Sequence, residues 1–154
     1  ELAQYLTKRN EVHIGYGETA NVNKHFLDNC QKLKIKTIPL PYLTRKIDIG
    51  KDFLFITEFK KILEKEKYNL IHLNSSKAGF VGSLSAKLYS MNPMNIKMRI
   101  VYTAHGFVFN EPLSSTKRKI YKTAEKFGAG IGNIIITVSD FDKQKTDELF
   151  VGKK

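Results

Sequence analysis

Two polar segments, each directly after an apolar strand-like run, carry the side chains that could do chemistry. In the first, Ser75, Ser76 and Lys77 follow the apolar run 70–73 and open a stretch with helical periodicity. The first turn of a helix has unpaired N–H groups and the positive end of the helix dipole, so it attracts anions. Two hydroxyls and an ammonium group at this position therefore predict a site of the phosphate-binding type. The competing interpretation is a plain serine helix cap.

Glycines in the same segment favour the binding site over the plain cap. Gly79 and Gly82 are poor helix formers, and close approach of a ligand to the backbone would explain both. We therefore expect Gly79 to line the site.

The second polar segment contains the candidate catalytic residue, His105. It follows the strand-like residues 98–103 and is continued by Gly106 and Phe107. The carboxyl ends of parallel strands face one ligand crevice in an open α/β sheet, so we expect both polar segments to meet there. Glu111 follows at a loop's length and could hydrogen-bond a hydroxyl or accept a proton. The competing interpretations are a histidine bonded to a loop carbonyl and a solvated carboxylate.

The remaining histidines and the cysteine are interpreted structurally. His72 lies inside an apolar strand, which predicts a hydrogen-bonded core histidine, and His13 and His25 have no polar companions at useful spacing. Cys30 shares a predicted helix face with apolar residues, so we expect a core thiol. A single cysteine excludes an internal disulfide and fits a reducing compartment.

Composition and charge limit the class of protein. The 154 residues suffice for one core and predict a single domain over 1–154, while 42% hydrophobic and 27% charged residues are typical of soluble globular proteins. We expect no signal peptide, and no run approaches the roughly 20 apolar residues of a membrane span. The net charge of +11 favours an anionic partner. Because no nucleic-acid-binding signature is present, we expect no nucleic-acid partner.

A basic stripe is predicted on the helix expected over 116–128. Arg118, Lys122 and Lys126 recur at four-residue spacing, and the opposite side is expected to bury apolar residues, namely Ile120, Ala124 and Phe127. The stripe predicts contact with an anionic membrane surface. A solvated helix face is the competing interpretation.

Strand-like and helix-like segments alternate along the whole chain. Strands are expected over 12–17, 36–40, 68–73, 98–103 and 134–138, and helices over 2–8, 19–33, 52–66, 76–89, 116–128 and 139–150. This order predicts an α/β fold with a parallel sheet and helices on both of its faces. Residues 134–138 are expected to be a fully buried strand. Ser139 and Asp142 predict a capping-box start for the last helix.

Three segments together carry a family resemblance. Residues 72–79, 103–107 and 136–139 resemble, in order and spacing, signatures of the N-terminal domain of family-four glycosyltransferases of the GT-B fold. In that family two Rossmann-like domains face each other across a cleft. The N-terminal domain mainly binds the acceptor, and the C-terminal domain holds the nucleotide sugar.

The resemblance implies roles for the candidate residues. His105 would lie in the cleft beside the transferred sugar, as the catalytic residue. Family members usually retain anomeric configuration and use no metal, because helix termini and basic side chains hold the diphosphate, so we expect no cofactor and a nucleotide-sugar co-substrate. Substrate contacts are expected from Ser75, Ser76, Lys77, Gly79, Gly106, Phe107, Glu111 and Ser139.

The resemblance also sets expectations for the whole enzyme. The family's first strand and glycine-rich loop should precede Glu1, and the nucleotide-sugar domain should follow Lys154, so residues 1–154 alone are expected to be inactive. The expected function is transfer of a sugar to a lipid-linked glycan acceptor in capsule, exopolysaccharide or lipopolysaccharide biosynthesis. We expect a cytoplasmic location, with peripheral contact at the inner face of the plasma membrane as an option. The alternative is a non-catalytic α/β domain that binds a phosphorylated ligand.

Overall fold

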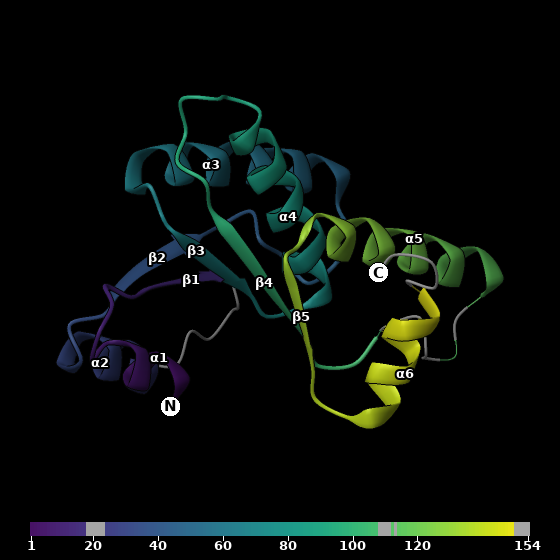
Figure 1. Cartoon of the computed structure of the whole chain (residues 1–154), viewed down its shortest axis with the longest axis horizontal. Coiled ribbons are helices and arrows are strands. Elements are labelled where there is room, and N and C mark those ends of the chain that lie inside the picture. Colours follow the sequence, from purple (N-terminus) through teal and green to yellow (C-terminus); the bar gives the residue numbers. More distant parts are fainter. Residues whose placement is uncertain (18–23, 108–111, 113, 150–154) are drawn as a thin grey trace. The chain divides into compact units, whose positions relative to one another are not determined.

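Helices and strands alternate along the chain in an α/β fold (Figure 1). The computed structural model describes residues 1–17, 24–107, 112 and 114–149. The chain forms two compact units, Glu1–Phe55 and Ile56–Lys154. All strand pairs in the described residues are parallel, as predicted, but they form two sheets where one was expected. The single domain over 1–154 stays a prediction.

The first unit contains a parallel strand pair. Its elements are α1 (Leu2–Leu6), β1 (His13–Gly17), α2 (Lys24–Lys32) and β2 (Lys36–Leu40). In the register of the two strands, His13 lies opposite Lys36 and Gly17 opposite Leu40. Cys30 is buried, which confirms the predicted core thiol. The first residues of the helix predicted over 19–33 fall outside the described residues.

The second unit contains a three-stranded parallel sheet in the order β3-β4-β5. Its elements are β3 (Leu70–Leu73), α4 (Ser76–Ser90), β4 (Arg99–Ala104), α5 (Ser115–Ile131), β5 (Ile134–Thr137) and α6 (Asp140–Leu149); α3 (Ile49–Glu66) begins in the first unit and ends in the second. Leu73 lies opposite Tyr102, and Ala104 lies opposite Thr137. The carboxyl ends of all three strands therefore share one edge of the sheet.

The core of the second unit is built around β4, its central strand. Every residue of β4 after Arg99 is buried, because strands lie on both of its sides and α4 packs across it. The buried core residues are Leu63, Ile71, Leu73, Ala86, Tyr89, Ile100, Tyr102, Ala104 and Phe107.

The prediction that 134–138 form a fully buried strand is wrong. Exposure alternates along β5, and the side chains of Ile134 and Ile136 are 54% and 44% exposed. In the part of the chain that the structure describes, β5 pairs only with β4 and forms an edge of the sheet. Successive side chains of a strand point to opposite faces, so only one face of β5 packs against the unit.

The predicted buried face of α5 is also wrong in two of its residues. Ile120 and Phe127 are 53% and 46% exposed, whereas Glu125 and Gly128 are buried. The reason is the contact with α4: a Cβ added to Gly128 would lie 2.9 Å from the carbonyl oxygen of Gly79. The absence of a side chain lets this face of α5 approach α4 closely. Phe127 lies at the border of the contact, with its ring edge-on to that of Phe80 in α4 at 5.8 Å between centroids.

Candidate functional site

Polar residues follow all three strands of the second unit at their common edge. Residues 74–77 follow β3, His105 and Gly106 follow β4, and Ser139 lies just after β5. Because the strands run parallel and side by side, these three segments emerge at the same end of the sheet (Figure 1). In open α/β sheets this end is where ligands bind.

The first turn of α4 is capped as its sequence predicts. Ser75 has an extended backbone, and its hydroxyl oxygen accepts a hydrogen bond from the Ala78 N–H over 3.1 Å. The Gly79 N–H donates to the carbonyl oxygen of Ser75 over 2.6 Å. Ser76 and Lys77 are half-buried in this turn. The cap holds the turn in place, with the positive end of the helix dipole at the edge of the sheet.

The two glycines of α4 pack the helix against the sheet. A Cβ on Gly79 would lie 2.8 Å from Cε2 of Tyr102, and a Cβ on Gly82 would lie 2.7 Å from Cδ2 of Leu73. Either contact is shorter than packed carbon atoms tolerate, so a larger residue would push α4 off the sheet. This packing explains both glycines, and a contact between Gly79 and a substrate stays a prediction.

His105 and Gly106 form the exposed turn after β4. Gly106 has a φ of 123°, a conformation that favours glycine, and no described atom lies within 4 Å of the place where its Cβ would be. The side chain of Phe107 lies in the core instead, at 5% exposure. Glu111 falls outside the described residues. The turn thus leaves His105 exposed at the edge, while the side chain of Phe107 is buried.

His72 is the hydrogen-bonded histidine that the sequence predicted. Its Nε2 lies 2.7 Å from the hydroxyl oxygen of Thr103, a contact that links β3 to β4. Burial lowers the pKa of His72 below 6.5, and the charge of the nearby His105 lowers it further. His72 is therefore held in its neutral form.

Ser139 caps α6 as predicted. Its hydroxyl oxygen accepts a hydrogen bond from the Asp142 N–H over 3.1 Å, and its O–H donates to Oδ2 of Asp142 over 2.7 Å. Asp142 is 7% exposed, whereas Ser139 is exposed at the edge of the sheet. The predicted helix start, with Ser139 bonded to Asp142, is confirmed, and a substrate contact by Ser139 stays a prediction.

A buried polar pair behind the edge was missed by the sequence reasoning. The Tyr102 hydroxyl donates a hydrogen bond to Oε2 of Glu125 over 2.9 Å, and both residues are buried. Burial raises the pKa of Glu125, while hydrogen bonds from Ser76 and Tyr102 oppose this shift. Burial and the nearby Glu125 carboxylate both raise the pKa of Tyr102. One signal could have found the pair: Glu125 is the single acidic residue in α5, which carries five basic ones.

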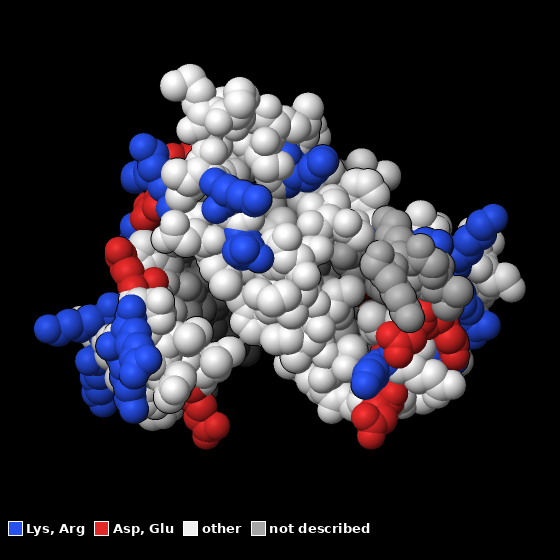
Figure 2. All heavy atoms as spheres, viewed as in Figure 1, with Lys and Arg blue, Asp and Glu red and all other residues white. Residues whose placement is uncertain are grey.

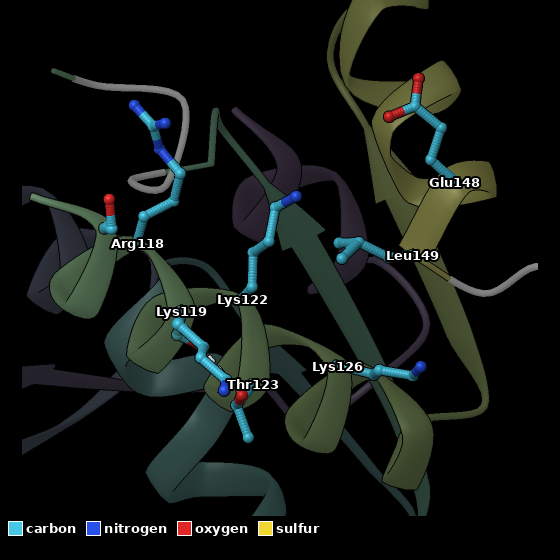
Figure 3. Close-up of a pocket in the computed structure, with 8 residues that line it drawn as sticks. Arg118, Lys119, Lys122, Thr123, Lys126, Glu148 and Leu149 are labelled. Atoms are coloured by element: carbon cyan, nitrogen blue, oxygen red, sulfur yellow. Dashed lines mark hydrogen bonds between the residues drawn. The ribbon is translucent and has the colours of Figure 1, made fainter. Parts of the chain in front are cut away.

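The basic stripe lines an open pocket between α5 and α6. Figure 2 shows basic side chains along α5 at the right of the view and acidic side chains gathered over α6. Arg118, Lys122 and Lys126 form one side of a pocket of about 410 Å³, with Glu148 and Leu149 of α6 on the other side (Figure 3). The structure thus brings the three cations together. Their partner is not identified by this geometry alone.

The described part of the chain has no helix suited to a membrane and no cluster of metal-ligating side chains. None of its helices combines the length and apolar character needed to cross a bilayer. Its His, Cys, Asp and Glu side chains form no group of three or more that could hold a metal ion. The absence of metal from the reaction stays a prediction.

Comparison with known proteins gives one family. The profile of Glycosyltransferase Family 4 matches residues 1–153. The chain is 32% identical over 110 residues to the Escherichia coli UDP-Gal:alpha-D-GlcNAc-diphosphoundecaprenol alpha-1,3-galactosyltransferase, a match that covers 71% of this chain and 27% of that protein. It is 23% identical over 111 residues to the candidate glycosyltransferase EpsD of Bacillus subtilis (strain 168), covering 67% of this chain and 28% of EpsD. The chain therefore matches little more than a quarter of the length of these relatives.

Proposed function

Because this chain belongs to glycosyltransferase family 4, we propose that it is the acceptor-binding N-terminal domain of a retaining glycosyltransferase. The α/β architecture with parallel strands agrees with the Rossmann-like N-terminal half of a GT-B enzyme. The other half would hold the nucleotide sugar. Residues 1–154 alone would then not transfer sugar, because the groups that hold the donor diphosphate would lie outside them.

One observation carries this proposal: the polar segments after β3 and β4 meet at the same edge of a parallel sheet. The hydrogen bond between His72 and Thr103 ties the two strands together just before they end. The turn with Ser75 and Ser76 follows one strand, and the exposed His105 follows the other. A substrate placed at this edge could contact both segments at once.

Each segment has a separate task in the proposed reaction. The first turn of α4 would bind the acceptor through the donors of Ser76 and Lys77, aided by the helix dipole. His105 would face the transferred sugar and stabilise the transition state by a hydrogen bond or charge. Gly106 would keep the backbone beside His105 free of a side chain, so that a sugar ring can approach.

The substrate classes follow from the family and from one relative. The printed name of the E. coli protein gives UDP-galactose as donor and a GlcNAc-diphosphate lipid as acceptor. For the present enzyme we propose a nucleotide-sugar donor and a diphosphate-linked lipid acceptor that serves capsule, exopolysaccharide or lipopolysaccharide synthesis. Such an acceptor presents its sugar at a membrane surface. The enzyme would therefore work in the cytoplasm, in peripheral contact with the inner face of the plasma membrane.

Arg118, Lys122 and Lys126 are the proposed membrane contact. The three cations lie together along one side of the α5 helix. Basic side chains close to an anionic bilayer gain electrostatic free energy. This contact would hold the acceptor edge close to lipid-linked substrate.

The test is turnover by the complete protein with His105→Ala. UDP-galactose and other nucleotide sugars would be supplied with a GlcNAc-diphosphate lipid acceptor in detergent. We expect kcat to fall on the order of a hundredfold or more, because a group that stabilises the transition state is lost. Thermal unfolding should change little, because the His105 side chain is exposed.

His25→Ala is the matched control, because His25 is an exposed histidine on α2 in the first unit and does not belong to any of the three polar segments after β3, β4 and β5. It should leave kcat unchanged. Near-normal turnover by His105→Ala would make His105 a structural turn residue. No turnover of any nucleotide sugar by the complete parent protein, together with binding of a phosphorylated ligand, would favour the non-catalytic alternative.

A further inference from the structure

Glu125 occupies an unusual position for a carboxylate. It is the single acidic residue of α5, yet it is 5% exposed, while the basic residues of the helix are exposed. Burying an ionisable group costs free energy unless hydrogen bonds and charges compensate for the lost water. The buried carboxylate of Glu125 therefore depends on the residues around it for hydrogen bonds.

The hydrogen bond of Glu125 links α5 to the strand that leads to His105. Tyr102, 1% exposed, donates from its hydroxyl to Oε2 of Glu125 over 2.9 Å. Tyr102 lies on β4, three residues before His105. The ring of Tyr102 also lies against Gly79 in the first turn of α4. The carboxylate of Glu125 thus holds a side chain that contacts the first turn of α4.

The backbones of these elements are packed closely around the network. Gly79 of α4 lies against the ring of Tyr102 on one side and against Gly128 of α5 on the other. A movement of the Tyr102 ring would therefore displace the first turn of α4. Tight packing transmits such shifts, because the interior has little free space.

The network satisfies the carboxylate only in part. Oε1 of Glu125 is buried and has no hydrogen-bond partner among the described residues. A half-satisfied buried carboxylate is worse for stability than an apolar side chain of the same size. Positions that break the folding rules without a gain in stability are expected at functional sites. The free-energy cost of burying the Glu125 carboxylate therefore points to a role in the functional site rather than in stabilising the fold.

We propose that Glu125 is a positioning residue, which fixes the first turn of α4 through Tyr102. This inference rests on the proposed function, in which that turn binds the acceptor. Glu125 does not touch the substrate. It holds the Tyr102 ring against Gly79, and the ring keeps the backbone N–H groups of the turn in the geometry that the acceptor requires.

The test compares three variants of the complete protein. Glu125→Met has a similar volume and makes no hydrogen bond, Glu125→Gln keeps one acceptor oxygen for Tyr102, and Tyr102→Phe removes the donor. The acceptor KM should rise about tenfold in Glu125→Met and Tyr102→Phe, as expected for the loss of one hydrogen bond. Glu125→Gln should stay close to the parent, and the donor KM should not change in any variant.

Tyr89→Phe is the matched control for Tyr102→Phe. Both tyrosines are 1% exposed in the same core, but Tyr89 lies in the last turn of α4, and its hydroxyl has no hydrogen-bond partner among the described residues. Removing the Tyr89 hydroxyl should leave the acceptor KM unchanged. Amide hydrogen exchange of residues 76–79 gives a readout independent of activity. Exchange there should be faster in Glu125→Met and Tyr102→Phe only.

The outcomes separate the positioning role from the proposed function. Unchanged exchange of residues 76–79 in both Glu125→Met and Tyr102→Phe would overturn the positioning role. If Glu125→Met fails to fold, Tyr102→Phe still decides between these results. Faster exchange with an unchanged acceptor KM would support the positioning of the turn and overturn its role as the acceptor site.

Discussion

Gly128 of α5 lies against the backbone of Gly79 in α4, so closely that a Cβ on Gly128 would be 2.9 Å from the Gly79 carbonyl oxygen. The other side of Gly79 faces the ring of Tyr102, which a Cβ on Gly79 would approach to 2.8 Å. Helices α5 and α4 therefore meet with no side chain between them at this point, and the Tyr102 ring lies between α4 and the backbone of β4. This close stacking is what lets Glu125 reach Tyr102.

Gly128→Ala should destabilise the chain, because its Cβ would meet backbone atoms that cannot rotate away. Overpacking of this kind costs about 1–3 kcal/mol. The urea concentration at the midpoint of unfolding should fall accordingly, with the slope of the transition unchanged.

Gly50→Ala is the control for the intrinsic effect of replacing a helical glycine. Gly50 lies in the first turn of α3, and its added Cβ would have only an ordinary contact, 3.5 Å from Oδ1 of Asp48. This variant should gain about 0.5–1 kcal/mol, because alanine favours the helix. Equal stability of Gly128→Ala and the parent would mean that α5 can move away from α4 at little cost.

His72 should make the stability of the chain depend on pH. Burial, with the charge of His105 nearby, lowers the pKa of His72 in the folded state below the unfolded value of 6.5. As the pH falls below 6.5, the unfolded chain takes up a proton at this residue before the folded chain does, so folding stability is lost. Above that pH the imidazole is neutral in both states, and the contribution is constant.

The measurement is urea unfolding of the parent and His72→Gln over a series of pH values. The parent should lose stability more steeply than the variant below pH 6.5, the unfolded pKa. The same comparison with His25→Gln is the control for replacing an exposed histidine by glutamine. Parallel curves for His72→Gln would show that His72 has the same pKa in the folded and unfolded states.

Features that depend on neighbouring residues in sequence were predicted well. The caps at Ser75 and Ser139 lie three residues from the N–H groups that they accept from, so their pattern is visible in the sequence. His72 was interpreted correctly because the apolar residues around it define its strand. The parallel arrangement followed from the alternation of strands and helices.

Features that depend on distant partners were not predicted. The apolar composition of β5 suggested burial on both faces, but a run of Ile residues does not reveal whether a strand has one neighbour or two. The buried face of α5 is decided by Gly128 and Glu125, whose partners in α4 and β4 lie more than twenty residues earlier. The packing of Gly79 against the Tyr102 ring was not predicted, because Tyr102 lies on a strand far along the sequence.

Gly106→Ala should disturb the turn that holds His105. The φ of Gly106 is 123°, which is strained for any residue with a Cβ, although space for the methyl group is available among the described atoms. Strain of this kind costs about 1–3 kcal/mol, or the backbone relaxes and moves His105. In the complete protein we expect kcat to fall and the midpoint of thermal unfolding to drop slightly.

The control is Gly132→Ala, since Gly132 ends α5 with a φ of −64°, which any residue adopts. It should keep parental turnover. If Gly106→Ala also turns over normally, then the position of His105 does not depend on this backbone conformation, and its assignment as catalytic residue loses support.

Replacing Arg118, Lys122 and Lys126 together by Ala should weaken binding to anionic vesicles. The three cations line one pocket with Glu148 and Leu149, so a membrane would meet them as a group (Figure 3). Each basic residue near an anionic bilayer contributes about 1 kcal/mol, so the loss of three should weaken binding on the order of a hundredfold. Sedimentation with phosphatidylserine-containing vesicles, at low and at physiological salt, measures the effect.

Lys51, Lys61 and Lys65 provide the control for net charge. All three are exposed on α3, and their replacement by Ala removes the same charge from another surface. A general attraction of the +11 chain to the bilayer would be weakened equally by both triple variants. A specific contact through α5 requires that only the first variant loses binding, and that its difference from the parent shrinks as salt screens the bilayer charge. Equal binding by that variant and the parent would assign the stripe to solvent.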